Sequence, residues 1–312
     1  MSGSIKLRFE GDKVCFCGMG GSAIGGDILS EYLFERSEKV VSVVRGVKLP
    51  AWVDEDTLTV VMSYSGNTLE SLALFRDAKE RGSPIVAITS GGELLGRCRQ
   101  AGLQVITVPS GIQPRAALGY LLGSAASVLE SAGISTPRSD IGRMLGRLES
   151  YRDTLVPGIP IGKNIAKRIA KKLLSKIPII YAPKSVRPAA TRWQTQINEN
   201  AKMMAASGEI PEMDHNQIVG WIEDTRKTKC VPVVLDNVSC GDLVGRIVDG
   251  TVDMLRGRGL DPEVIELPGD DNLEAMIHGI VLGDFVSFYL AMLKGVDPTP
   301  VASIQELKGR IG

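Results

Sequence analysis

A glycine-rich turn near the N-terminus constrains the fold of this chain more than any other stretch. Val14–Cys17 is an uncharged apolar run, which is typical of a strand covered on both faces. Gly18, Gly20 and Gly21 follow, and glycine permits backbone angles and close approaches that a side chain would block. Ser22 stands where it could cap a following helix, whose free N–H groups attract an anion. We therefore expect a strand, a turn and a helix that together hold a phosphate, although a plain turn without a ligand also fits these residues.

The turn matches the dinucleotide-binding pattern poorly. In the spacing G-x-G-x-x-G, Ala23 occupies the place of the third glycine. An acidic partner for a ribose is expected about twenty residues further on, where this chain has Val43, Val44 and Arg45. Dinucleotide binding is therefore disfavoured, and the turn alone does not say which phosphate is bound.

Composition and charge exclude several classes of function. The 312 residues are 44% hydrophobic, which is enough for two ordered domains of ordinary size. Lys+Arg and Asp+Glu are equal at 36 each, so electrostatics gives no reason to expect nucleic-acid or membrane binding. Met1–Lys13 is polar and of mixed charge, unlike a signal peptide, and no apolar run is expected to reach the length of a membrane span.

The cysteines and histidines predict a reduced, cytoplasmic protein without a metal or another cofactor. The five cysteines are odd in number and form no C-x-x-C pair, so we expect free thiols. Only two histidines are present, His215 and His278, so a histidine-rich metal site is not available. His278 falls in an apolar helical stretch, where we expect it to be packed.

The first half of the chain alternates between strands and helices. Strands are predicted at 40–44, 58–62, 84–89 and 105–108, and helices at 22–34, 69–80, 94–99 and 114–129. This alternation predicts an α/β domain with a parallel sheet and helices on both faces. Ligands of such sheets bind beyond the carboxyl ends of the strands, where the glycine turn and a second loop, Ser63–Thr68, both fall.

The second loop carries three hydroxyls, on Ser63, Ser65 and Thr68, between a buried strand and a helix. Hydroxyls and the free N–H groups of a helix start can surround a phosphate without any cation. Alternatively, Ser65 or Thr68 merely caps the helix while Asn67 shapes an Asx turn. Capping accounts well for one hydroxyl and poorly for three, which favours phosphate binding.

The second half repeats the alternation and predicts a second doubly wound domain. Strands are expected at 177–181, 231–235 and 263–267, and helices at 162–176, 189–204, 243–256 and 273–293. We place the first domain at 1–135, a connection with a helix near 141–151 at 136–162, and the second domain at 163–312. The loop at 183–188 lacks the glycines and hydroxyls of the first domain, so no second phosphate site is expected. The basic face of helix 162–176 is better explained by solvation than by RNA or membrane binding.

Three charged or titratable residues stand out. Arg115 follows Pro114 at a helix start, where the helix dipole disfavours a cation, so a specific anionic partner is expected. Glu199 lies between Asn198 and Asn200, which are poor helix formers and indicate a polar site. His215 lies between Asp214 and Asn216 in a loop, where a histidine is more often exposed or structural than catalytic.

The pair of motifs Gly20–Ser22 and Ser63–Thr68 resembles a sugar isomerase (SIS) domain, whose second loop holds a sugar phosphate by its hydroxyls. The chain as a whole resembles the archaeal-type bifunctional phosphoglucose/phosphomannose isomerases. The resemblance is carried by the order in which these motifs are followed by Asn198–Asn200, by Asp214–Asn216 and by the tail from Val296 to Lys308. The resemblance covers most of the chain. It implies two SIS-like domains and a homodimer in which His215 reaches the neighbouring subunit's site.

The resemblance also implies an activity, the interconversion of glucose or mannose 6-phosphate with fructose 6-phosphate through a cis-enediol, without a metal. The implied substrate-binding residues are Gly20, Gly21, Ser22, Ser63, Ser65 and Thr68, and the implied catalytic residues are Glu199, His215, Lys308 and Arg115. Glu199 would move the proton between C2 and C1, His215 with Lys308 would open the sugar ring, and Arg115 would stabilise the enediolate.

Two alternatives stay open. SIS domains also occur in regulators that sense sugar phosphates; a sensor would keep the hydroxyls, would not need Glu199 or His215, and would usually carry a DNA-binding helix-turn-helix. No such segment is predicted. Other SIS isomerases act on amino-sugar phosphates, including the isomerase half of an amidotransferase whose glutaminase half has no counterpart here.

Overall fold

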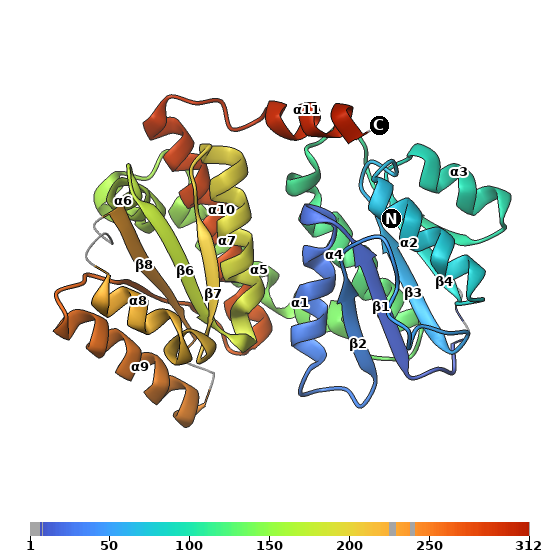
Figure 1. Ribbon diagram of the computed structural model, residues 1–312, viewed down its shortest axis with the longest axis horizontal. Coiled ribbons are helices and arrows are strands. Elements are labelled where there is room, and N and C mark those ends of the chain that lie inside the picture. The colour runs from blue at the N-terminus through green and yellow to red at the C-terminus, as the bar shows by residue number, and fades with distance from the viewer. Residues whose placement is uncertain (1–6, 8, 225–228, 238–240, 312) are drawn as a thin grey trace. The chain divides into compact units, whose positions relative to one another are not determined.

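The computed structural model describes residues 7, 9–224, 229–237 and 241–311. The chain folds into two compact units, Met1–Arg143 and Met144–Gly312, each with its own parallel sheet (Figure 1). Helix α5 (Pro137–Leu155) begins in the first unit and ends in the second, and it is longer at both ends than the helix expected near 141–151. The prediction of two parallel α/β domains is confirmed.

The sheet of the first unit has five parallel strands in the order β2-β1-β3-β4-β5. Its strands are β1 (Lys13–Gly18), β2 (Val40–Val44), β3 (Thr57–Met62), β4 (Ile85–Thr89) and β5 (Gln104–Thr107). The central strand β3 is buried along its whole length, as expected for a strand covered on both faces. Because β1 lies at the point where the strand order reverses, the turn after it opens where ligands of such sheets bind.

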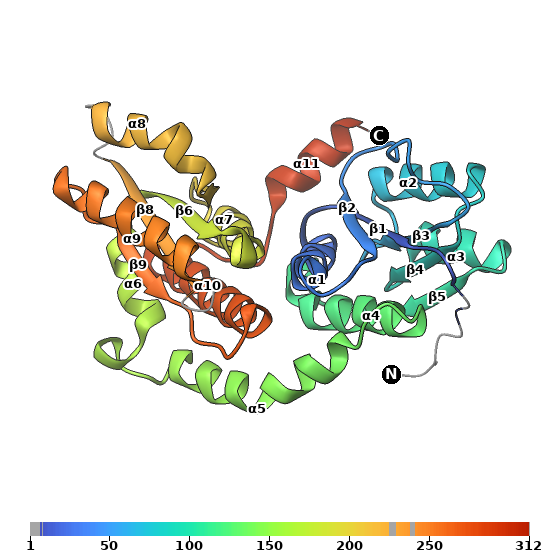
Figure 2. The same cartoon turned by 90° about the horizontal axis from the view of Figure 1, so that it is seen from below.

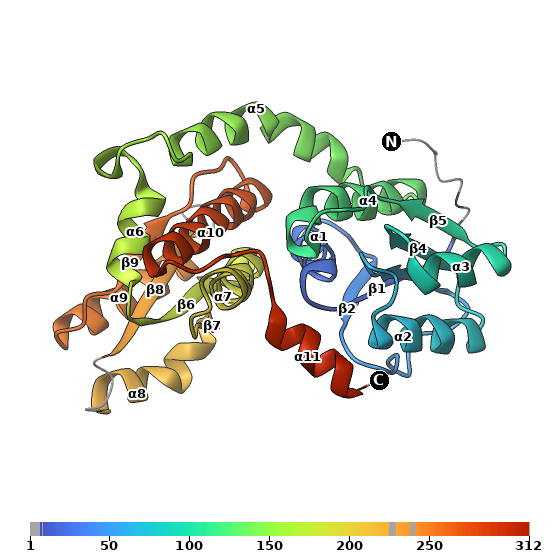
Figure 3. The same cartoon turned by 90° about the horizontal axis from the view of Figure 1, so that it is seen from above.

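Four helices cover this sheet: α1 (Ile24–Leu33), α2 (Leu69–Glu80), α3 (Gly92–Gln100) and α4 (Leu118–Ser131). Helices α1 and α4 lie on one face, and α2 and α3 lie on the other (Figures 2 and 3). Successive side chains of β1 point to opposite faces of the sheet. Cys15 and Cys17 pack in the core under α2 and α3, while Phe16 faces α1. A Cβ atom on Gly26 of α1 would lie 2.8 Å from the Cβ atom of Phe16, so glycine lets this helix approach the strand closely.

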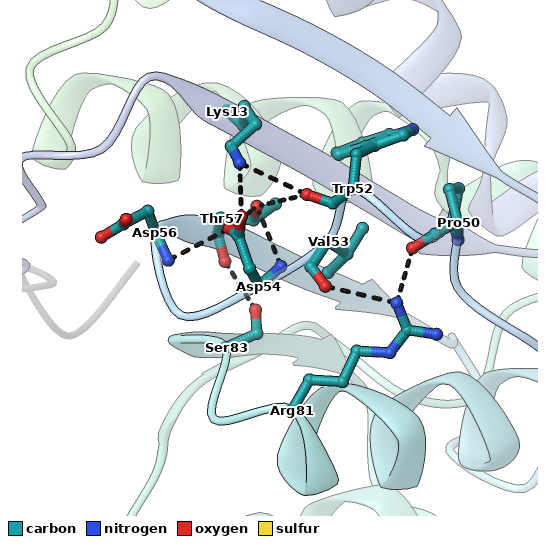
Figure 4. A network of polar contacts seen from close by, with 9 residues as sticks. All are labelled: Lys13, Pro50, Trp52, Val53, Asp54, Asp56, Thr57, Arg81 and Ser83. Carbon is teal, nitrogen blue, oxygen red and sulfur yellow. Dashed lines mark hydrogen bonds and ion pairs between the residues drawn. The ribbon is translucent and has the colours of Figure 1, made fainter.

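A polar network fastens the loop between β2 and β3 to the amino edge of the first sheet (Figure 4). The Lys13 ammonium at the start of β1 bonds the Asp54 carboxylate at 2.7 Å, and the Thr57 hydroxyl donates to the same carboxylate at 2.7 Å. The Ser83 hydroxyl donates to the Thr57 carbonyl, and the Arg81 guanidinium donates to the carbonyls of residues 50 and 53. These bonds stabilise the amino edge, which lies opposite the edge that carries the glycine turn.

The second unit has a four-stranded parallel sheet in the order β7-β6-β8-β9. Its strands are β6 (Ile177–Pro183), β7 (Ala206–Ile210), β8 (Cys230–Asp236) and β9 (Glu263–Glu266). Its helices are α6 (Ile165–Leu173), α7 (Arg187–Ala201), α8 (Gln217–Glu223), α9 (Asp242–Gly257), α10 (Asn272–Lys294) and α11 (Ala302–Ile311). Helices α6, α7 and α10 pack together, while α8 and α9 pack with Tyr181 and Val234 on the other face.

Among the described residues of the second unit, one strand and two α-helices are absent from the predicted set. Strand β7 contains serine, glycine and glutamate, and it pairs only with β6 at the edge of the sheet, so its sequence carries no apolar pattern. Helix α8 has seven residues, too few for a clear helical period. Helix α11 has no buried residue, so the burial pattern that would reveal it is missing.

Helix α10 meets the length and hydropathy criteria for a membrane span, contrary to the expectation that no segment of this chain would. Two thirds of its most apolar window is buried inside the unit. The Trp193 indole of α7 donates to the Gly279 carbonyl at 2.7 Å, and a Cβ atom on Gly283 would lie only 2.2 Å from the Trp193 ring. This helix is therefore a core helix of the second unit. His278 on it is buried, as predicted, with its ring edge-to-face against Tyr151.

Candidate active site

Two loops at the carboxyl edge of the first sheet are joined through the Ser22 hydroxyl. Residues Gly20–Ser22 form a 3-10 turn after β1, and α1 begins only at Ile24. The N-cap residue is Ala23, so the prediction that Ser22 caps this helix is wrong. The buried Ser22 hydroxyl instead accepts a hydrogen bond of 3.1 Å from the Tyr64 N–H in the loop after β3. The glycine turn is thereby fixed against the hydroxyl-rich loop.

The hydroxyls of the second loop lie at the start of α2. Ser63 is buried; its hydroxyl donates to the Thr68 hydroxyl and accepts from the Gly66 N–H, both at 3.2 Å. Ser65 is exposed and accepts from the N–H of residue 67 at 3.2 Å. Thr68 is the N-cap residue of α2, but its side chain makes no capping bond. The capping alternative therefore fails for Ser65 and Thr68, and their hydroxyls remain beside N–H groups that attract an anion.

Glycines let this loop interlock with the loop after β4. Gly66 has φ +70°, and a Cβ atom there would lie 1.9 Å from the Gly91 carbonyl oxygen. The Leu94 N–H donates to the Gly66 carbonyl at 2.9 Å, and the Glu93 N–H donates to the Asn67 side-chain oxygen at 2.8 Å. Asn67 therefore holds the neighbouring loop, where an Asx turn within its own loop was the alternative. Two loops of the carboxyl edge form one connected framework.

Arg115 lies against the first glycine turn. It belongs to a 3-10 turn, Pro114–Ala117, that precedes α4, and only 7% of it is exposed. A Cβ atom on Gly21 would lie 3.3 Å from the Arg115 Cα atom, so the two turns pack backbone against backbone. The guanidinium donates to the Gln113 side chain at 3.4 Å. Arg115 therefore packs against the turn of Gly20–Ser22, and that turn is bonded through Ser22 to the loop that carries the three hydroxyls.

Glu199 lies in the last turn of α7, and it is partly exposed. Lys202 is the C-cap residue of this helix; its φ of +51° is left-handed, and its ammonium donates to the Glu199 carbonyl at 2.6 Å. The Asn198 side chain accepts from the Ala205 N–H at 2.9 Å, and the Asn200 amide donates to the Ser287 hydroxyl of α10 at 2.9 Å. The polar residues around Glu199 thus fix the helix end that carries it.

His215 is exposed at the end of the 3-10 turn Glu212–His215, directly after β7. Its neighbour Asp214 points inward, where one carboxylate oxygen accepts from the Thr251 hydroxyl of α9 at 2.9 Å. The other oxygen of Asp214 is buried and has no hydrogen-bond partner. Burial raises the pKa of Asp214 above the ordinary carboxyl range. Asp214 therefore anchors the turn, and His215 faces the solvent.

Lys308 is exposed on α11. Glu199, His215 and Lys308 therefore stand on three different elements of the second unit, whereas Arg115 and the six hydroxyl and glycine residues belong to the first. In the described part of the chain, no three His, Cys, Asp or Glu side chains form a group that could hold a metal ion. The described cysteines are free thiols, and Cys240 lies outside the described residues.

Two residues at the carboxyl edge are absent from the predicted site. Ser90 follows β4, and its hydroxyl donates to the Tyr64 carbonyl at 2.6 Å. The sequence Ser90-Gly91-Gly92 after a predicted strand repeats the pattern of hydroxyl and glycine seen in the first two loops, and this signal could have revealed it. Tyr64 stands inside the hydroxyl-rich motif, but its hydroxyl bonds the Pro109 carbonyl and the Ile112 N–H.

The chain matches known proteins along most of its length. Residues 7–117 match the SIS domain, and residues 162–311 match the bacterial phospho-glucose isomerase C-terminal SIS domain. A bifunctional phosphoglucose/phosphomannose isomerase of Caldicellulosiruptor bescii is 39% identical over 99% of this chain and 92% of the relative, and one of Aquifex aeolicus is 36% identical over 95% and 89%. The tagatose-6-phosphate ketose/aldose isomerase of Escherichia coli shares the fold, with a TM-score of 0.68 at 16% identity over 93% of this chain and 85% of that one. This chain is a member of the bifunctional phosphoglucose/phosphomannose isomerase family.

Proposed function

We propose that this protein is an aldose–ketose isomerase that interconverts glucose 6-phosphate or mannose 6-phosphate with fructose 6-phosphate. The observation that carries the proposal is the set of hydroxyls and turns at the carboxyl edge of the first sheet. The hydroxyls of Ser63, Ser65 and Thr68 surround the start of α2, and Arg115 lies against the adjacent glycine turn. This arrangement suits the phosphate of a phosphorylated sugar, and the family relatives are named for this reaction.

The phosphate group would be held by neutral donors. The hydroxyl of Ser63 donates to that of Thr68, which leaves the Thr68 proton available for an anion. The exposed Ser65 hydroxyl and the N–H groups at the start of α2 supply further donors. A phosphate held in this way needs no metal ion, and we propose a reaction without one.

The chemistry would use the four remaining site residues. His215 and Lys308 exchange protons with the ring oxygen and the C1 hydroxyl, which opens the hexose ring. The Glu199 carboxylate then takes the C2 proton of the aldose and returns it to C1, and Arg115 stabilises the negative charge of the enediolate. Rotation of this intermediate about the C2–C3 bond would let glucose and mannose 6-phosphate share one base. We also propose that the protein is cytoplasmic and that it forms a homodimer. Each active site of this dimer would take its His215 from the partner subunit.

The Glu199→Gln variant tests the enzyme assignment. The amide keeps the shape of the side chain and removes the base, so turnover should fall by about two to four orders of magnitude. The glucose and mannose reactions should fall together, and substrate should still bind. Isomerisation by the wild type in D₂O should place deuterium at C2 of the aldose product. Near-normal kcat in the variant would exclude Glu199 as the base.

Two further measurements separate the proposal from its alternatives. A sugar-phosphate sensor would bind fructose 6-phosphate and show no turnover in a coupled assay, and an amino-sugar isomerase would turn over glucosamine 6-phosphate instead. For the dimer, mixing inactive Glu199→Gln and His215→Ala chains should restore part of the activity, because one hybrid site would be intact. No restored activity, with subunit exchange verified, would place His215 in its own subunit's site or outside catalysis.

A further inference from the structure

We infer that Tyr64 is a positioning residue for Arg115, because its phenol holds the loop that leads to Arg115 against the phosphate-binding loop. The inference rests on the proposed role of Arg115. Tyr64 lies between two hydroxyl residues of the loop after β3, and it is 94% buried. All the contacts that carry the inference lie within the first unit.

The Tyr64 phenol bridges two points of the segment between β5 and α4. Its hydroxyl donates to the Pro109 carbonyl at 2.9 Å, and it accepts from the Ile112 N–H at 3.1 Å. Both capacities of the hydroxyl are therefore used on one segment, on either side of residues 110 and 111. Ile112 is followed by Gln113 and Pro114, so Arg115 lies three residues after this bond.

The backbone of Tyr64 is held as firmly as its side chain. Its N–H donates to the Ser22 hydroxyl at 3.1 Å, and its carbonyl accepts from the Ser90 N–H at 2.9 Å and from the Ser90 hydroxyl at 2.6 Å. One residue thus joins the glycine turn, the hydroxyl-rich loop, the loop after β4 and the loop before Arg115. A phenol on so fixed a backbone can transmit the position of the phosphate-binding loop to Arg115.

The backbone at Arg115 is restrained from both sides. On one side its Cα atom packs against Gly21, and on the other the segment before it is held by Tyr64. Removal of the phenol hydroxyl leaves the packing at Gly21 and frees the segment that precedes Pro114. Arg115 would then shift relative to a phosphate whose own donors are unchanged. A displacement of about 1 Å between a catalytic group and the reacting atoms lowers the rate by about 100-fold.

The test compares Tyr64→Phe with Tyr32→Phe. Tyr32 lies on α1 in the same unit, and its hydroxyl donates to the Asp140 carboxylate, so the control also loses a tyrosine hydrogen bond. Tyr64→Phe should lower kcat by about 10- to 100-fold, and Tyr32→Phe should leave kcat unchanged within about twofold. The competitive inhibition constant of inorganic phosphate should stay within about twofold of the wild type in both variants. The inhibition constant of 5-phosphoarabinonohydroxamate, which mimics the enediolate, should rise with Tyr64→Phe by the factor that kcat loses.

A double-variant cycle with Arg115→Met separates failure of this inference from failure of the proposed function. If Tyr64 acts through Arg115, the double variant has the same kcat as Arg115→Met alone. Multiplicative losses in kcat, or a rise in the phosphate inhibition constant that matches the loss in kcat, would overturn the positioning role. Normal turnover in Arg115→Met would instead refute the proposed role of Arg115 in the reaction.

Discussion

A substitution at Gly66 tests the interlocking of the two loops at the carboxyl edge. In Gly66→Ala, the new Cβ atom would lie 1.9 Å from the Gly91 carbonyl oxygen, so the loops must separate by roughly 1 Å. The left-handed backbone at φ +70° adds a strain of about 1–2 kcal/mol for any residue with a side chain. Separation of the loops weakens the two hydrogen bonds from Leu94 and Glu93, each worth about 0.5–1.5 kcal/mol. Together these effects should destabilise the protein by about 2–5 kcal/mol.

Gly82→Ala is the matched control. Gly82 has φ +71°, nearly the same as Gly66, but a Cβ atom there would meet no heavy atom within 4 Å. Urea unfolding should therefore show only the strain of about 1–2 kcal/mol, and the difference between the variants measures the contact between the loops. Because Gly66 lies between Ser65 and Thr68, KM for fructose 6-phosphate should rise in Gly66→Ala and not in Gly82→Ala. Equal loss of stability in the two variants, with KM unchanged in both, would refute the close approach of these loops.

Three further predictions concern the second unit and the chemistry. Hydrogen bonds from Arg147 lower the pKa of the buried Glu274 carboxyl, so Glu274→Gln should reduce the free energy of unfolding at neutral pH. This loss of stability should shrink as the pH falls below the ordinary carboxyl range, and a loss that does not change with pH would contradict the prediction. Burial raises the pKa of Asp214, so the ionised carboxylate destabilises the fold. In urea unfolding, Asp214→Asn should therefore be more stable than the wild type at pH 7 but not near pH 4, and a loss of stability at pH 7 would refute this prediction. Isomerase activity should survive dialysis against EDTA, and a loss that Zn²⁺ or Mn²⁺ restores would point to a metal-dependent reaction.

The parts of the fold that follow a regular pattern are predictable from the sequence. The apolar runs that become β1, β3 and β4 are short, uncharged and separated by helical stretches, so they predict a parallel sheet directly. Strand β7 escapes prediction because an edge strand needs no apolar run on both faces. Helix α10 is a case where composition misleads, because a helix buried on most of its surface has the hydropathy of a membrane span.

The candidate site is predictable where chemistry and spacing coincide, as in the three hydroxyls of Ser63–Thr68. The hydrogen bonds between its loops cannot be predicted from the sequence, since they depend on which loops meet at the edge of the sheet. Ser22 looks like a helix cap in sequence, yet its hydroxyl bonds the loop after β3, 42 residues away. Asn67 likewise bonds the loop after β4 and makes no turn of its own. Sequence spacing cannot show such contacts, because they arise from the order of strands in the sheet.

The helix end that carries Glu199 shows how the second unit can hold a carboxylate in an unfavourable place. The C-terminal turn of a helix has a partial negative charge, so a glutamate there is destabilising by itself. The Lys202 ammonium donates to the Glu199 carbonyl, and the Lys294 ammonium of α10 donates to the carbonyls of residues 201 and 202, each at 2.9 Å. Two cations thus occupy the carbonyls that would otherwise repel the carboxylate. The two lysines therefore offset the unfavourable helix dipole at the turn that carries Glu199.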